Sequence, residues 1–166
     1  TIKGLLNLTF DEKAIKMLAG KEDVNIKIKQ LDESNLNEAA KTKIGNRPVF
    51  SLDVMVDSKT VSSFGSGKVN VEIPYTLGVG EDPEAILVYY VKDDGELVSV
   101  VSQYKDGFVS FTTSHFSTYA VGYNKVAFTD NTGWYKNAVT YLSSRGIING
   151  VGNGMFMPNK EITRGE

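Results

Sequence analysis

The side chains that most often carry out chemistry are scarce in this sequence. His115 is the only histidine and there is no cysteine, which removes most metal sites and serine–histidine catalysis. Ser114 precedes His115, but neighbouring residues of a strand point to opposite faces, so we expect a structural histidine. No pair of carboxylates has a spacing that suggests glycosidase chemistry. The sequence therefore predicts no catalytic residue and no cofactor.

Two short motifs can also be interpreted as ligand sites. The carboxylates of Glu81, Asp82 and Glu84 are close together in the sequence and could bind Ca²⁺, although a solvated loop is the simpler interpretation. The motif Gly150-x-Gly152-x-Gly154 is faintly similar to a glycine-rich phosphate loop. It follows a predicted helix rather than a strand and opens no βαβ unit, so we interpret it as a tight turn. We predict no metal site.

Composition and charge narrow the class of protein. The chain has 166 residues, 41% of them apolar, and a net charge of −2, which is enough apolar material for a packed core. Basic residues form no long cluster, so the sequence gives little support for nucleic-acid binding. Residues 125–166 carry five basic and three acidic groups, whereas residues 1–124 are net acidic. No apolar run approaches the roughly 18–20 residues of a membrane span.

Two short helices are expected in the first third of the chain. Residues 9–20 begin with a Thr9-x-x-Glu12 capping box, carry an apolar stripe that includes Phe10, and end at Gly20. A second helix is expected at 35–44, started by Ser34 and stopped by Gly45.

The rest of residues 1–123 is predicted to form strands. Apolar and polar residues alternate over several short segments, which places one side of each strand inward. Residues 85–91 are apolar on both faces, as in a central strand covered on both sides. Asp94-Gly95 and Asp106-Gly107 are hairpin turns. The alternating inward sets are Val24, Ile26 and Ile28; Phe50, Leu52, Val54 and Val56; and Val69, Val71, Ile73 and Tyr75.

This pattern predicts a fold of the α+β class that is mainly β: an antiparallel β-sandwich with short helices over residues 1–123. A small helical part follows over residues 124–166. The junction at Asn124-Lys125 has no Gly/Ser-rich linker, so the two parts can pack directly against each other.

The helical part is predicted to contain one helix at about 134–145. Trp134, Ala138 and Leu142 lie at helical spacing and are expected to form its buried stripe, with Asp130 or Thr132 as its N-cap. Gly146 should end the helix. Ile147 and Ile148 are expected to be buried in a short extended stretch.

The last 41 residues resemble the first half of an S-layer homology module, the repeat that tethers bacterial proteins to cell-wall polysaccharide. The matching positions are Phe128, Asp130, Trp134, Ala138, Leu142, Gly146, Ile147, Ile148, Gly150, Phe156, Pro158, Asn159, Thr163, Arg164 and Glu166. Thr163-x-x-Glu166 has the form of a capping box at the start of a second helix. We therefore expect the chain to be a piece of a longer protein that lacks the rest of the module.

The resemblance implies four site residues: Asp130, Trp134, Gly150 and Arg164 would contribute to recognising an anionic wall saccharide. An arginine can bind a carboxylate through two hydrogen bonds, and an aromatic ring offers an apolar face to a sugar. A structural role competes at each position: core packing for Trp134, helix capping for Asp130 and backbone geometry for Gly150. Because family grooves form between neighbouring repeats, an incomplete repeat is expected to bind weakly.

Residues 67–122 also resemble a β-rich module found upstream of such repeats in Gram-positive surface proteins. The implied function is a non-catalytic spacer and anchor that is extracellular, located at the cell wall or S-layer, and bound to secondary cell-wall polysaccharide. Two alternatives remain. The chain could be the accessory C-terminal region of a secreted, surface-anchored glycoside hydrolase. The β-sandwich itself could bind carbohydrate or protein, which exposed coplanar rings among Tyr75, Tyr89, Tyr90 and Tyr104 would support.

Overall fold

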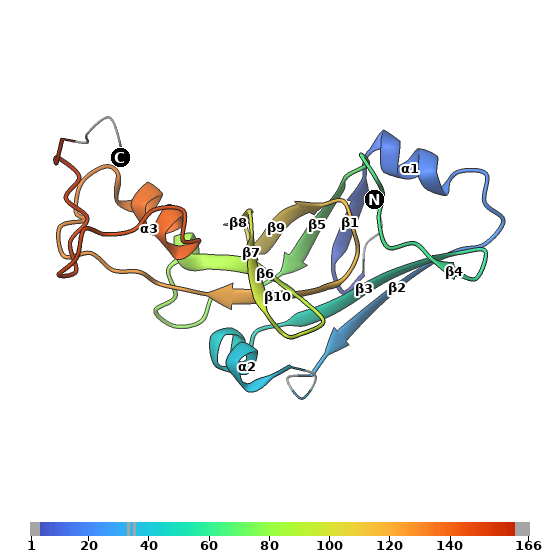
Figure 1. Ribbon diagram of the computed structural model, residues 1–166, viewed down its shortest axis with the longest axis horizontal. Coiled ribbons are helices and arrows are strands. Elements are labelled where there is room, and N and C mark those ends of the chain that lie inside the picture. Colours follow the sequence, from blue (N-terminus) through green and yellow to red (C-terminus); the bar gives the residue numbers. More distant parts are fainter. Residues whose placement is uncertain (1–3, 33, 35, 162–166) are drawn as a thin grey trace.

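The computed structural model describes residues 4–32, 34 and 36–161. All strand pairs among these residues are antiparallel, and the strands form two sheets. The mainly-β, antiparallel prediction is therefore confirmed. Figure 1 shows helix α1 (Glu12–Leu18) at one end of the molecule and helix α3 (Lys136–Ser144) near the other.

The smaller sheet has four strands in the order β1-β5-β9-β8. Its hairpin β8–β9 turns at Asp106-Gly107, where both residues have positive φ (51° and 84°), as a tight two-residue turn requires. The strands are β1 (Asn7–Phe10), β5 (Val69–Pro74), β8 (Ser102–Lys105) and β9 (Phe108–Thr113).

The larger sheet has the order β2-β3-β10-β6-β7, with the short strand β4 paired to β3. The predicted Asp94-Gly95 turn connects β6 to β7, and Gly95 has φ 84°. A 3₁₀ turn, η2 (Pro83–Ala85), precedes β6. The strands are β2 (Val24–Leu31), β3 (Val49–Val56), β4 (Lys59–Thr60), β6 (Ile86–Val91), β7 (Leu97–Val100) and β10 (Thr118–Tyr123).

The main core lies between the two sheets, because each sheet contributes one face of alternating buried residues. From the small sheet, Val69, Val71 and Ile73 are fully buried. From the large sheet, Leu52 and Val54 are buried in the same cluster. The predicted inward sets of β3 and β5 are confirmed for these residues. On β2 the prediction was partly wrong: Val24 is 38% exposed, and Ile26 and Ile28 are only partly buried.

A second apolar cluster explains why β6 is apolar on both faces. Helix α2 (Glu38–Ile44) covers the outer face of the large sheet, where Ala40 and Ile44 pack in one cluster with Leu87 and Tyr89. Figure 1 shows α2 below β10 and β3. The helix thus turns the outer face of β6 into a second core.

Both early helices start later than predicted, because other elements use the expected cap residues. Thr9 and Phe10 belong to β1, paired with β5, and Asp11 caps α1 by accepting a hydrogen bond from the Ala14 N–H (2.7 Å). Asn37, not Ser34, caps α2. The predicted ends are confirmed, since Gly20 and Gly45 have positive φ.

Candidate functional site

Asp130 holds the loop after α3 rather than capping the helix. Its two carboxylate oxygens accept hydrogen bonds from the backbone N–H groups of Phe156 (2.8 Å) and Met157 (2.7 Å). These bonds, that of Phe156 first, lower the pKa of Asp130 below its usual value. The predicted capping role of Asp130 and Thr132 is wrong: Tyr135 is the N-cap of α3, and no side chain bonds there.

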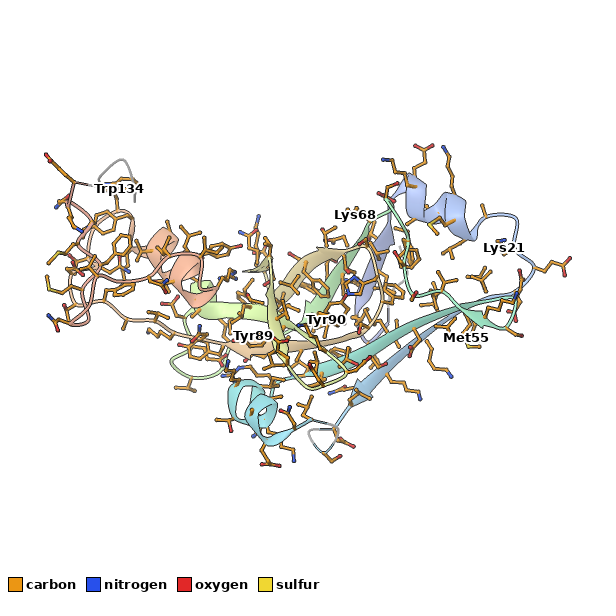
Figure 2. All side chains as sticks on the ribbon, viewed as in Figure 1. Lys21, Met55, Lys68, Tyr89, Tyr90 and Trp134 are labelled. Carbon is orange, nitrogen blue, oxygen red and sulfur yellow. The ribbon has the colours of Figure 1, made fainter. Side chains whose placement is uncertain are left out.

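Trp134 lies at the surface, contrary to the predicted core position. Its side chain is 95% exposed and contacts the Tyr135 ring edge-to-face, with centroids 5.8 Å apart. Figure 2 shows Trp134 at one end of the molecule, away from the two sheets. Ala138 is exposed and Leu142 only partly buried. The indole face is therefore available to a ligand.

Residues other than the predicted ones form the buried side of α3. Its buried residues are Val139, Thr140, Ser143 and Ser144. Gly146, with φ 69°, ends the helix as predicted. Ile147 is 58% exposed, so its predicted burial is also wrong.

Gly150 is required by packing rather than by an unusual φ. A Cβ atom there would lie 2.4 Å from Phe128 Cε1 and 2.6 Å from the Met155 carbonyl oxygen. The Phe128 ring in turn lies against Phe156, with centroids 5.6 Å apart. The absence of a side chain at Gly150 thus allows the loop of Gly150, Gly152 and Gly154 to pack against the ring of Phe128, which itself contacts Phe156.

Gly150→Ala is expected to lower the free energy of unfolding by about 1–3 kcal/mol, because the added methyl group overpacks this contact. Chemical denaturation measures the change. Gly4→Ala is the matched control, since a Cβ at Gly4 meets no atom within 4 Å. If both variants are equally stable, the packing role assigned to Gly150 is incorrect.

An open cavity of about 490 Å³ lies beside these residues. It combines a carboxylate, an aromatic ring, an amide and an ammonium group, which suits a polar ligand. Trp134 adjoins it through its contact with Tyr135. The cavity is lined by Asp130, Thr132, Tyr135, Met157, Pro158, Asn159 and Lys160.

The structure thus brings Asp130 to the cavity, and the ring of Trp134 contacts the lining residue Tyr135. Gly150 does not line the cavity but lies against Phe128. Arg164 and the capping box Thr163-x-x-Glu166 lie outside the described residues. Tyr135 and Lys160 line the cavity but were not predicted as site residues. The adjacent aromatic pair Trp134-Tyr135 was the available signal for the first of them.

Arg145 joins α3 to the β-sandwich, a role that was not predicted from the sequence. Its guanidinium nitrogens donate hydrogen bonds to the backbone carbonyls of Glu84 (3.0 Å), Ile86 (2.7 Å) and Ser102 (2.8 Å). It also donates to the Tyr141 carbonyl (2.9 Å) and lies 3.5 Å from the centroid of that ring. Burial lowers the pKa of Arg145.

Two more hydrogen bonds connect α3 to the β-sandwich and to the residue that follows it, Asn124. The Asn124 amide donates to the Ser144 carbonyl (2.6 Å), and the Tyr141 hydroxyl donates to the Ser102 carbonyl (2.9 Å). Residues on both sides of the Asn124-Lys125 junction therefore pack directly against each other.

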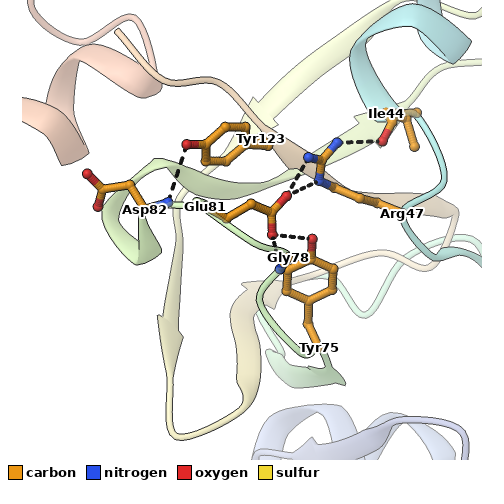
Figure 3. A network of polar contacts seen from close by, with 7 residues as sticks. All are labelled: Ile44, Arg47, Tyr75, Gly78, Glu81, Asp82 and Tyr123. Atoms are coloured by element: carbon orange, nitrogen blue, oxygen red, sulfur yellow. Dashed lines mark hydrogen bonds and ion pairs between the residues drawn. The ribbon is translucent and has the colours of Figure 1, made fainter. Parts of the chain in front are cut away.

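The acidic group at 81–84 is not a solvated cluster. Glu81 points inward, with its side chain 10% exposed, and forms an ion pair with Arg47. It also accepts hydrogen bonds from the Tyr75 hydroxyl (2.7 Å) and the Gly78 N–H (2.8 Å). Figure 3 shows this network beside Tyr123, whose ring lies 5.3 Å from the Arg47 guanidinium carbon.

Asp82 is separate from Glu81, because it caps η2 by accepting from the Glu84 N–H. Within residues 4–32, 34 and 36–161, no three His, Asp or Glu side chains are grouped so that they could hold a metal ion. None of the helices in that part of the chain has the length and apolar character needed to cross a bilayer.

The four tyrosines considered as a carbohydrate platform do not form one. Tyr75 and Tyr104 meet edge-to-face, with an interplanar angle of 89°. Tyr89 is 7% exposed and packs in the cluster under α2. Tyr90 packs edge-on against His115, with centroids 5.2 Å apart. This arrangement also gives His115 a packing role, as predicted.

Comparison with known proteins adds two similarities. Residues 128–166 match the family model of the S-layer homology domain. The chain is 30% identical over 151 residues to an amylopullulanase of Thermoanaerobacterium thermosulfurigenes. That similarity covers 86% of this chain, so it extends well into the β-sandwich, but the chain spans only 8% of the length of the relative. No solved structure matches.

Proposed function

We propose that this chain, which is part of a cell-surface protein containing an S-layer homology segment, links an extracellular protein to the bacterial cell wall by binding secondary cell-wall polysaccharide. Residues 1–123 would be the spacer and residues 124–166 the anchor segment, with no catalytic role in either. The observation that carries the proposal is the family match at 128–166, together with an indole at Trp134 that is 95% exposed beside an open polar cavity.

The chemistry of the site suits an anionic saccharide. The exposed face of Trp134 can pack on a sugar ring, and Lys160 at the cavity and Arg164 in the sequence supply positive charge. Asp130 is an anion, but both of its oxygens are occupied by backbone N–H groups. We therefore assign Asp130 the role of positioning Met157 and the cavity wall, and Trp134 and Arg164 the ligand contacts.

A second candidate is favoured by the similarity to an amylopullulanase. The chain would then be an accessory region of a surface-anchored glycoside hydrolase. It would use the same anchor, and the catalytic residues would lie in another part of the parent protein. Under both candidates the location is extracellular, at the cell wall.

The test is co-sedimentation with purified Gram-positive sacculi, using the chain extended by complete S-layer homology repeats. Trp134→Ala is expected to weaken binding at least tenfold while changing the free energy of unfolding by no more than about 0.5 kcal/mol, because the side chain is exposed. Arg164→Ala should cost roughly 1.5–3 kcal/mol of binding if it meets a carboxylate.

Lys136→Ala, an exposed change two residues after Trp134, is the control and should bind normally. Sacculi stripped of their polysaccharide by mild acid should bind none of the proteins. Undiminished binding to stripped sacculi, or normal binding by both Trp134→Ala and Arg164→Ala, would place the function elsewhere.

A further inference from the structure

We propose that the outer face of the small sheet is a binding site for an uncharged polysaccharide, separate from the cavity at Asp130 to which wall binding is assigned. On β5, Val69, Val71 and Ile73 point into the core, so Asn70 and Glu72 point outward. The register places side chains from neighbouring strands in two rows on this outer face. One row is Asn7, Glu72, Ser110 and Gln103, and the other is Thr9, Asn70 and Thr112. Val101, just before β8, lines the same cavity as Asn70 and Thr112.

The chemistry of these rows matches sugar hydroxyl groups. Amide and hydroxyl side chains both donate and accept hydrogen bonds, as each sugar hydroxyl does. Glu72 is the one charged side chain in the two rows, and its carboxylate accepts a hydrogen bond from the Asn7 amide (3.1 Å). The exposed part of the large sheet is different, because Lys27, Lys29 and Asp53 put charges on its outer side.

The face is also hollowed at one end. A cavity of about 300 Å³ is lined by eight residues, none of them charged. Val101, 76% exposed, and the Tyr141 ring supply apolar surface at its border, which a carbohydrate site needs beside its hydrogen-bonding groups. The lining residues are Asn70, Val101, Ser102, Gln103, Ser110, Phe111, Thr112 and Tyr141.

The border of this cavity is preorganised. The Tyr141 hydroxyl is fixed by its bond to the Ser102 carbonyl, and the Arg145 guanidinium covers one side of the ring. A ligand would therefore meet a ring that is already in place, which lowers the entropy cost of binding. Arg145 itself is 9% exposed and hydrogen-bonded to carbonyls, so it adds little attraction for an anion.

These features favour an uncharged glycan over the other occupants. An anionic polymer would find no cation among the lining residues. A protein partner would need a central apolar anchor point, and Val101 is the one strongly exposed apolar side chain there.

Native electrophoresis of the whole chain through gels containing a soluble polysaccharide tests the proposal. The neutral probes are soluble starch, arabinoxylan and barley β-glucan, and the anionic probe is polygalacturonate. We expect at least one neutral probe to retard the chain. The double change Asn70→Ala/Gln103→Ala should reduce that retardation at least fivefold, whereas Lys27→Ala/Lys29→Ala on the other sheet should not change it.

A thermal melt of each variant verifies folding, and Thr112→Val, which removes a hydroxyl at nearly constant volume, replaces the double change if that variant unfolds. Retardation by none of the neutral probes, retardation by polygalacturonate alone, or full retardation of the folded face variant would overturn the proposal. Sacculus binding by the extended protein is measured separately, and Asn70→Ala/Gln103→Ala should leave it intact. A failure of the proposed sheet-face site, seen by gel retardation, is thus distinguishable from a failure of the anchoring function, seen by sacculus binding.

Discussion

Arg145→Ala is expected to lower the free energy of unfolding by more than about 3 kcal/mol and to release α3 from the β-sandwich. A hydrogen bond to a charged group contributes roughly 1.5–3 kcal/mol, and the substitution removes four donors at once. Three of the carbonyls that lose this donor belong to Glu84, Ile86 and Ser102, on the other side of the contact. The Ser102 carbonyl keeps its hydrogen bond from the Tyr141 hydroxyl. Urea denaturation should show the loss, and limited proteolysis should show new cleavage between residues 125 and 135.

Two further variants separate charge from packing. Arg145→Lys keeps the charge, but an ammonium group cannot span the same carbonyls as a planar guanidinium, so we expect only partial recovery. Arg145→Met keeps much of the apolar stem and none of the donors, so it should resemble alanine. Lys136→Ala, exposed on the same helix, should be neutral. A variant Arg145→Met as stable as the wild type would show that the hydrogen bonds contribute little.

The sandwich was predictable because its interior imposes a strict alternation on the sequence. Residues such as Leu52, Val54 and Val71 face the main core because they lie on the sides of the two sheets that pack against each other. The Asp-Gly turns were equally informative, since their positive φ values suit few residues. The apolar residues of β6 indicated that both faces of this strand are buried. They did not indicate that α2 is the element that buries the outer face.

Helix starts were less predictable, because a capping motif competes with strand pairing. Thr9-x-x-Glu12 has the right spacing for a cap, yet Thr9 pairs with Asn70 in the small sheet. Asp11 then provides the cap two residues later. Local propensity gave the correct element, and a long-range contact moved its boundary.

The candidate site was predictable only as a list of residues, not as an arrangement. An apolar stripe at helical spacing suggested that Trp134 was core, but α3 packs through Val139, Ser143 and Ser144 and leaves the indole exposed. The reason is Arg145, whose partners are backbone carbonyls of η2, β6 and the start of β8. Backbone carbonyls leave no signature in a sequence, so that contact could not be inferred from residue types.

The second large effect is expected at Glu81, where Glu81→Gln should lower the free energy of unfolding by roughly 3 kcal/mol. Removing one partner of a buried ion pair costs about 3–5 kcal/mol, and we expect the lower end because the Arg47 side chain is 22% exposed. Glutamine keeps the size of the side chain but leaves the guanidinium of Arg47 without a counter-ion. Glu96→Gln, in the exposed pair with Lys92, is the matched control and should cost less than about 1 kcal/mol.

The pH dependence of stability should identify the same network. Burial alone would raise the pKa of Glu81, but hydrogen bonds from Tyr75, Gly78 and Arg47 outweigh it and hold the pKa below its usual 4.5. Its contribution is therefore complete above pH 4.5 and is lost as the pH falls through the lower folded value. Wild-type stability should decline on acidification, and the decline should be smaller in Glu81→Gln.

The alkaline side gives an independent measurement of the network. Burial, together with the hydrogen bond to Glu81, raises the pKa of Tyr75 from 10 to about 12. A raised tyrosine pKa contributes stability below pH 10 that is lost as the pH approaches 12, because the unfolded state loses its proton first. Tyr75→Phe should therefore flatten the stability curve between pH 10 and 12, as measured by urea denaturation at each pH. An equally steep decline in Tyr75→Phe would mean that other tyrosines determine the alkaline limit and that the Tyr75–Glu81 contact is weak in solution.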